Sequence, residues 1–337
     1  MKKIIALLLC VLTFAGSLSG CSTNKDSDKI EIVTTIFPEY DWVREIVGEN
    51  ADRVNITMLL DSGTDLHSYQ PTAADIVKVA TCDLFIYVGG ESDGWVADVL
   101  KTANNPKMIV VNLLEVLGDK VKEEEIKEGM EGEHDHDQNH DEEEEHDHEH
   151  EHHHDEDEIE FDEHVWLSLR NAVDLTEYIA EKIKQLDPEK ADSYAANTSA
   201  YVSKLNALDA KYAAAVAEGR VKTLVFGDRF PFRYLVNDYG LDYFAAFVGC
   251  SAESEASFDT IKFLSDKVNE LGVKAIMRIE SSTNEIAQTV KNTTNTKDQS
   301  ILVLNSLQSV TSRDVKNGTT YLGVMEQNLE VLKEALK

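Results

Sequence analysis

Residues 188–219, PEKADSYAANTSAYVSKLNALDAKYAAAVAEG, decide the fold of this 337-residue chain. Apolar side chains recur in this stretch at spacings of three, four and seven residues, which is the pattern of one helix face. Pro188 suits the first helical turn and Gly219 the end of the helix, and no glycine or proline lies between them. The residues of the predicted face are Tyr194, Tyr201, Val202, Leu205, Leu208, Tyr212 and Val216. At 1.5 Å per residue the helix 188–218 would be about 46 Å long. Because this is more than one lobe needs, we expect it to connect two lobes as a rigid strut.

Strands and helices alternate on both sides of this helix. Runs rich in β-branched residues predict four strands before it and four after it, with helical patterns between them. Such alternation is typical of parallel βαβ units. We therefore predict an α/β fold with two Rossmann-like lobes, residues 30–187 and 219–337, each a mainly parallel sheet with flanking helices. The predicted strands are 30–36, 54–59, 84–88 and 108–112 in the first lobe, and 223–226, 243–248, 275–279 and 300–304 in the second.

A histidine-rich acidic tract interrupts the first lobe. Residues 131–160 hold nine of the eleven histidines and seventeen carboxylates, with no lysine or arginine. Nothing in this stretch can form a core, so we expect residues 119–160 to be a disordered loop. Imidazole and carboxylate groups are ligands of divalent ions, which favours auxiliary metal capture over a merely solvated acidic loop. The histidines of the tract are His134, His136, His140, His146, His148, His150, His152, His153 and His154.

The net charge of the chain points to cations as partners. Of the formal charge of −31, the tract contributes −17 and the other residues −14. The remainder of the chain is therefore also acidic and repels nucleic acid and anionic lipid. We expect a monomer that binds no nucleic acid.

The N-terminus has the layout of a secretion signal. Lys2 and Lys3 precede an apolar run, residues 4–15, and small residues lead to Cys21. The apolar run is too short to span a bilayer. The segment Leu18-Ser-Gly-Cys21 resembles the bacterial lipobox. We therefore predict a signal peptide at residues 1–20, lipidation of Cys21, and a polar tether at residues 21–29 that holds the protein outside the cytoplasm on the cell membrane.

Two cysteines remain after such processing, Cys82 and Cys250, one in each lobe. A pair of this kind is no disulfide framework, although an exported protein could oxidise it. We favour two unpaired, buried small residues, because free cysteine commonly behaves as a small hydrophobe.

Only two histidines, His67 and His164, lie outside the tract, and both fall in predicted loops at strand ends. In open α/β sheets ligands lie at the carboxyl ends of the strands. A lone histidine is more often a surface or capped residue than a ligand. Two of them in one lobe, with the tract between them, favour a metal site instead.

Three segments resemble the zinc and manganese solute-binding proteins of ABC importers. Residues 61–72, DSGTDLHSYQPT, are similar to that family's G-x-D-P-H-x-Y-x-P loop, and residues 162–168, DEHVWLS, to its D-P-H-x-W-L-x-P loop. Residues 249–257, GCSAESEAS, resemble its G-x-x-x-E-x-E-P-S segment. The resemblance implies a two-lobed receptor that holds one divalent ion between its lobes and delivers it to a membrane permease. It also implies that His67 and His164 are metal ligands.

The second lobe departs from the family pattern. The expected H-x-A-F-x-Y or E-x-A-F-x-Y element is replaced by residues 227–234, GDRFPFRY, which place either Gly227 or Arg229 at the ligand position. Neither side chain binds a cation. We predict that Asp228 supplies the third ligand, although an aspartate here also suits a helix cap. Glu280 is a reserve candidate, and Asn305, where some relatives have aspartate, would be a weak neutral ligand.

Two imidazoles and one carboxylate, with one position open to water, suit zinc. The same ligands would also hold manganese, which prefers oxygen. We predict zinc, with a manganese receptor or an adhesin of the same family as the alternative. Two other classes stay open: an exported zinc hydrolase, for which no H-E-x-x-H signature occurs, and a metal buffer in which the tract itself is active.

Overall fold

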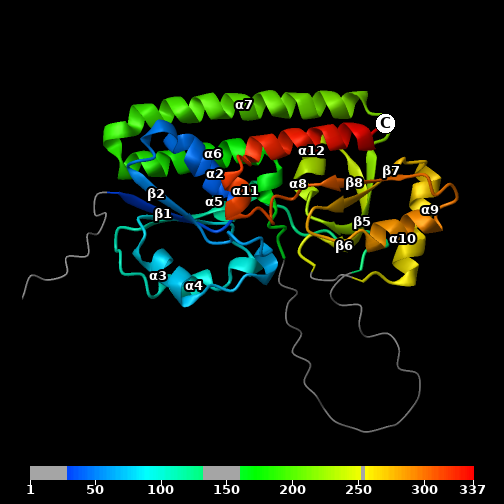
Figure 1. Cartoon of the computed structure of the whole chain (residues 1–337), viewed down its shortest axis with the longest axis horizontal. Helices are drawn as coiled ribbons and strands as arrows, with labels where there is room; N and C mark the ends of the chain where they lie inside the picture. The colour runs from blue at the N-terminus through cyan, green and yellow to red at the C-terminus, as the bar shows by residue number, and fades with distance from the viewer. Residues whose placement is uncertain (1–28, 132–159, 252–254) are drawn as a thin grey trace, which may run out of the picture.

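The computed structural model describes residues 29–131, 160–251 and 255–337. Two four-stranded parallel sheets lie side by side, one in each lobe (Figure 1). The first has the strand order β2-β1-β3-β4 and the second the order β6-β5-β7-β8, which confirms the predicted α/β fold. The strands of the first sheet are β1 (Ile30–Thr34), β2 (Val54–Met58), β3 (Leu84–Tyr87) and β4 (Ile109–Asn112). Those of the second are β5 (Thr223–Phe230), β6 (Asp242–Val248), β7 (Ala275–Ile279) and β8 (Ser300–Leu304).

Helices flank both sheets. Three of these helices, α4, α5 and α11, are only five residues long. The helices of the first lobe are α2 (Phe37–Val47), α3 (Ala73–Thr81), α4 (Val96–Leu100), α5 (Leu113–Leu117) and α6 (Leu169–Leu186). The helices of the second lobe are α8 (Arg233–Tyr239), α9 (Phe258–Leu271), α10 (Glu285–Thr293), α11 (Ser312–Lys316) and α12 (Tyr321–Ala335).

The long helix is α7, Ala191–Glu218, and a 3-10 turn at Pro188–Lys190 precedes it. It packs against α6 and α2 of the first lobe and against α12 of the second. Figure 1 shows α7 running along one side of the molecule past both sheets. Its predicted face is buried except for Val202, which is half-buried. The expectation of one helix that connects two lobes is therefore confirmed.

Strand β5 is longer than predicted. We expected it to end at Phe226, but it continues to Phe230 with a register shift against β6 between Phe226 and Arg229. Gly227 lies at this shift, and a Cβ there would come within 2.5 Å of the Cα of Ala287, so only glycine fits. The extension places Asp228 and Arg229 inside a strand instead of a loop.

One continuous apolar core extends through both lobes. It joins side chains from both sheets with the buried face of α7, and a smaller second cluster lies beside β6 and α9. A buried polar contact also joins the lobes, because the carboxylate of Asp41 in α2 accepts a hydrogen bond of 2.7 Å from the backbone N–H of Tyr321 at the start of α12. The lobes are thus held together on the α7 side.

The segment up to Glu131, the first residue of the tract, is ordered and reaches the second lobe, whereas we expected a disordered loop from residue 119 onward. The backbone N–H of Glu131 donates to the carbonyl of Ala246 in β6 at 2.9 Å, so part of the chain that the sequence assigns to the first lobe lies along the second sheet. No helix among the described residues combines the length and apolar character that crossing a bilayer requires. The predicted signal peptide, Cys21 and the nine histidines of the tract lie outside the described residues.

Candidate metal centre

His67 lies in a 3-10 turn, Leu66–Ser68, in the connection between β2 and α3. Asp65 caps this turn, because its carboxylate accepts a hydrogen bond of 3.1 Å from the backbone N–H of His67. The imidazole Nδ1 lies 2.7 Å from the hydroxyl oxygen of Ser92. The backbone and one ring nitrogen of His67 are therefore both held in place.

His164 directly precedes a second 3-10 turn, Val165–Leu167, and is fully buried. One oxygen of Asp162 accepts from the backbone N–H of His164 at 2.9 Å and lies 3.1 Å from its Nδ1. The ring also packs against Trp166, with 5.2 Å between the ring centroids. Because a carboxylate faces Nδ1, the proton belongs on Nδ1 and the lone pair on Nε2.

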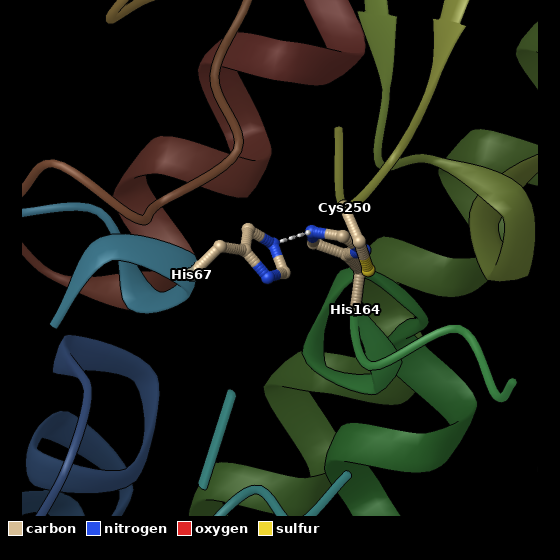
Figure 2. Close-up of side chains that lie close together, drawn as sticks. All are labelled: His67, His164 and Cys250. Carbon is tan, nitrogen blue, oxygen red and sulfur yellow. Dashed lines mark hydrogen bonds between the residues drawn. The ribbon is translucent and has the colours of Figure 1, made fainter. Parts of the chain in front are cut away.

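The two imidazoles meet through their Nε2 atoms, which share one hydrogen bond. The Nε2 atoms of His67 and His164 lie 3.2 Å apart, and Figure 2 shows the two rings pointing toward one another from separate segments. In each ring the other nitrogen faces an oxygen of a neighbouring residue, which is how histidine ligands of metals are usually oriented. The predicted pair is therefore brought together by the fold.

Burial keeps His67 neutral. Burial lowers the pKa of the His67 imidazole well below its usual range, and the positive charge of His164 or of Arg229 would lower it further. The lone pair of a neutral imidazole is the form that binds a metal. At neutral pH His67 is thus ready to act as a ligand.

Cys250 is the third residue of the group. One ligand nitrogen from each imidazole and the Sγ atom of Cys250 all lie within 4.8 Å of one another (Figure 2). Cys250 follows the end of β6 and is half-buried. Its thiol is unpaired, as is that of Cys82, which lies in the first lobe and donates to the carbonyl of Val79 at 3.2 Å. We expected both cysteines to be buried, but only Cys82 is, and Cys250 lies half-buried beside the two imidazoles.

Asp228 does not join this group. Its carboxylate accepts hydrogen bonds from the backbone N–H of Ile279, at 2.8 Å, and from the hydroxyl of Ser282. Burial raises the pKa of this carboxyl, although these hydrogen bonds partly offset the effect. The side chain therefore connects β5 to the end of β7, because the extension of β5 places it inside the sheet.

The two other candidates for a third ligand are also engaged elsewhere. Glu280 accepts from the backbone N–H of Ser306 at 2.7 Å and from the hydroxyls of Ser306 and Ser309. The side-chain oxygen of Asn305 accepts from the backbone N–H of Leu307 at 2.8 Å. Glu280 thus orders the loop after β8 and, like Asp228, is absent from the group of ligand atoms that gather around the imidazoles.

Arg229 lies beside the centre, where the positive charge of its guanidinium is balanced by a carboxylate. Its guanidinium forms an ion pair with Asp65, the residue that caps the turn of His67. Burial raises the pKa of Asp65, but the charge of Arg229 and the hydrogen bonds from Arg229 and from the backbone N–H of His67 outweigh this and hold the pKa below its usual value. Since Arg229 belongs to β5 and Asp65 to the first lobe, the pair connects the lobes at the edge of the site.

Comparison with known proteins gives the family of this chain. The family described as "Zinc-uptake complex component A periplasmic" matches residues 32–335, nearly all of the chain. This chain belongs to that family. The zinc-uptake family consists of solute-binding components and not of enzymes.

Relatives of known name cover the whole chain. The "Zinc-binding lipoprotein AdcA" of Streptococcus pneumoniae serotype 4 is 34% identical over 99% of this chain, which spans 61% of the length of that protein. The "High-affinity zinc uptake system protein ZnuA" of Bacillus subtilis is 30% identical over 99% of this chain and 96% of its own length. The structure of the Zn(II)-bound ZnuA-like domain of S. pneumoniae AdcA is similar in fold, with a TM-score of 0.68 and 28% identity over 91% of this chain and 99% of that one.

The sequence of this zinc-uptake family member indicated the pair of imidazoles but not the thiol that lies beside them. Ser92 and Cys250 were both missed. For Cys250 a signal existed, because it stands two residues beyond a strand of a parallel sheet, at the carboxyl edge where ligands lie. For Ser92 no motif pointed to the site.

Proposed function

We propose that this protein captures a zinc ion outside the cytoplasm and delivers it to the permease of an ABC importer. The observation that carries the proposal is the distance of 3.2 Å between the Nε2 atoms of His67 and His164. Two nitrogens that bind one tetrahedral zinc ion lie about 3.3 Å apart, from Zn–N bonds of about 2.0–2.1 Å. The pair therefore has the spacing that a shared zinc ion requires.

Zinc suits this centre better than manganese does. Both aligned ligands are imidazoles, which zinc accepts readily, whereas manganese favours carboxylate and water oxygens. The carboxylates beside the rings face their Nδ1 atoms instead of the Nε2 atoms: an oxygen of Asp162 lies 3.1 Å from Nδ1 of His164, and one of Glu163 lies 3.6 Å from Nδ1 of His67. The names of the relatives, a zinc-binding lipoprotein and a zinc uptake system protein, support the same ion.

Attachment, partner and assembly belong to the same proposal. Cys21 would carry the lipid that holds the chain at the membrane, and a permease would receive the ion from the lobes. The nine histidines of the tract would raise the local zinc concentration beside the centre, without forming the tight site. We propose that the protein acts in this way as a monomer.

The proposal is tested by zinc affinity. His67→Ala and His164→Ala should each weaken zinc binding at the tightest site by about 100-fold or more. Removing a hydrogen-bond partner of a metal ligand typically lowers the metal affinity by about 10–100-fold, and removing the ligand itself lowers it at least as much. Competition against a chromogenic chelator measures this site separately from weaker binding by the tract. The matched control is His134→Ala, which removes one imidazole from the tract and should leave the tight site unchanged.

Two outcomes would contradict the proposal. If His67→Ala and His164→Ala bind zinc as tightly as the parent chain, the tract is the functional site and the protein is a metal buffer. If manganese binds more tightly than zinc in a direct competition, the receptor serves a different ion.

A further inference from the structure

We infer that the thiolate of Cys250 is the third protein ligand of this centre, which makes it a two-imidazole, one-thiolate zinc site with a fourth position open to water. This inference rests on the proposed function, because it names a ligand of the same site. It replaces the predicted ligand Asp228, whose carboxylate is bound to the end of β7. A thiolate also changes which ions the site accepts.

The distances allow three ligands to share one ion. In a tetrahedral site a nitrogen and a sulfur ligand lie about 3.6 Å apart, given Zn–S bonds of about 2.3 Å. The Sγ atom of Cys250 and one nitrogen of each imidazole lie within 4.8 Å of one another in the structure. An adjustment of about 1 Å, within the reach of a cysteine side-chain rotation, completes the geometry.

Hydrogen bonds on both sides of Cys250 hold it at the site. Its backbone N–H donates to Glu124 at 3.2 Å, and the next carbonyl, that of Ser251, accepts from the guanidinium of Arg229 at 3.4 Å. The same guanidinium pairs with Asp65, which caps the turn of His67. Arg229, one of the two residues that align with the ligand position of the family, therefore positions both the cysteine loop and the turn of His67.

Gly249 allows the cysteine loop to approach His164. A Cβ at Gly249 would lie 3.0 Å from Cε1 and 3.1 Å from Nδ1 of the His164 ring, and 3.0 Å from the carbonyl oxygen of Phe230. These contacts are tighter than packed side chains normally make. The glycine thus permits the backbone beside Cys250 to press against a ligand ring.

The surroundings of Cys250 attract a dication. The carboxylate of Glu124 accepts from the backbone N–H of Cys250, and those of Asp162 and Glu163 lie nearby. Burial and these carboxylates raise the pKa of the Cys250 thiol, so zinc has to displace its proton. Zinc binding forms one Zn–S bond, breaks the S–H bond and releases the proton to water. The bound dication then faces a thiolate and nearby carboxylates, which offset its charge.

A thiolate ligand determines which metal ions the site prefers. Thiolate is a soft ligand that selects zinc, cobalt and copper over manganese. A centre built on two imidazoles and Cys250 should therefore discriminate against manganese more strongly than one that uses a carboxylate.

Cobalt spectroscopy tests the inference on the full chain. In a background where Cys10 and Cys21 are serine, Cys82 and Cys250 are the remaining thiols. The first equivalent of Co²⁺ should produce a sulfur-to-cobalt charge-transfer band in the near ultraviolet, which the histidines of the tract cannot produce. Cys250→Ser and Cys250→Ala should abolish this band, retain weaker d–d absorption, and weaken zinc binding by about tenfold or more. Cys82→Ser, the matched control, should retain the band.

The outcomes separate this inference from the proposed function. If the charge-transfer band survives in Cys250→Ala, Cys250 is not the ligand, but the proposed function stands. The same conclusion follows if the parent chain shows no such band while its d–d absorption disappears in His67→Ala. Cobalt absorption that is insensitive to His67→Ala overturns both. Circular dichroism of each variant in the presence of a chelator confirms that the chain is folded.

Discussion

At the scale of single residues, the orientation of the His67 ring depends on one hydroxyl. The hydroxyl oxygen of Ser92 lies 2.7 Å from His67 Nδ1, and the backbone N–H of Ser92 donates to Glu163 at 2.9 Å. Glu163 directly precedes His164 in the sequence. Glu163, the neighbour of the ligand His164, therefore positions Ser92, and Ser92 in turn orients the ring of His67.

Ser92→Ala should weaken zinc binding by about 10-fold, because it removes the oxygen that fixes the ring and its tautomer while leaving both imidazoles in place. Chelator competition measures the change. Ser203→Ala is the control, because the Ser203 hydroxyl donates to a carbonyl within α7, far along the chain from either ligand. Equal affinities of the two variants would show that the Ser92 contact has no part in orienting the ligand.

At the scale of helices and strands, the sequence predicted most elements because their patterns are local. The buried face of α7 follows from its apolar spacing, and the strands of both sheets follow from runs of β-branched residues. The end of β5 could not be predicted in this way. Its last residues include Gly227 and Asp228, which normally mark a turn, and the strand continues beyond them because Arg229 and Phe230 pair again with β6.

The contact between α2 and α12 gives a pH dependence. Burial raises the pKa of Asp41 to about 6 from its usual 3.8, and the hydrogen bond from Tyr321 and the charge of Arg44 only partly offset this. Below pH 3.8 the carboxyl is protonated in both the folded and the unfolded chain. Between pH 3.8 and about 6 the folded chain holds a proton that the unfolded chain has released, so stability falls as the pH rises.

Asp41→Asn should therefore become more stable relative to the parent as the pH rises from about 4 to about 6, by up to roughly 3 kcal/mol. An asparagine oxygen still accepts the N–H of Tyr321. The free energy of unfolding, measured by denaturant titration in the presence of a chelator, gives the difference at each pH. Asp52→Asn, which alters an exposed carboxylate, should show no such trend. A difference between Asp41→Asn and the parent that does not vary with pH would contradict the role assigned to Asp41.

At the scale of the whole molecule, the site exists because two lobes meet. His67 lies in the first lobe, between β2 and α3, and Cys250 lies in the second, just after β6. The ion pair between Arg229 and Asp65 connects the two lobes at the edge of the centre. The continuous core and α7 hold this arrangement from the opposite side.

The whole-molecule view also explains what could be predicted of the site. His67 and His164 stand in motifs that can be read one at a time, and two such motifs indicate one site. The third ligand depends on which side chains of the second lobe lie close to the two imidazoles. The register of β5 and the close approach of Gly249 to the His164 ring determine which side chains these are. A prediction from the linear order favoured Asp228, whereas the fold turns that carboxylate toward β7 and brings Cys250 to the imidazoles.

The central claim is that His67 and His164 bind the same zinc ion. Anomalous scattering at the zinc absorption edge, recorded from crystals of the zinc-loaded chain, locates that ion directly. We expect one strong peak between the lobes, with the Nε2 atoms of both residues about 2.0–2.1 Å from it. A peak bound by only one of these rings, or separate ions on each, would contradict the claim.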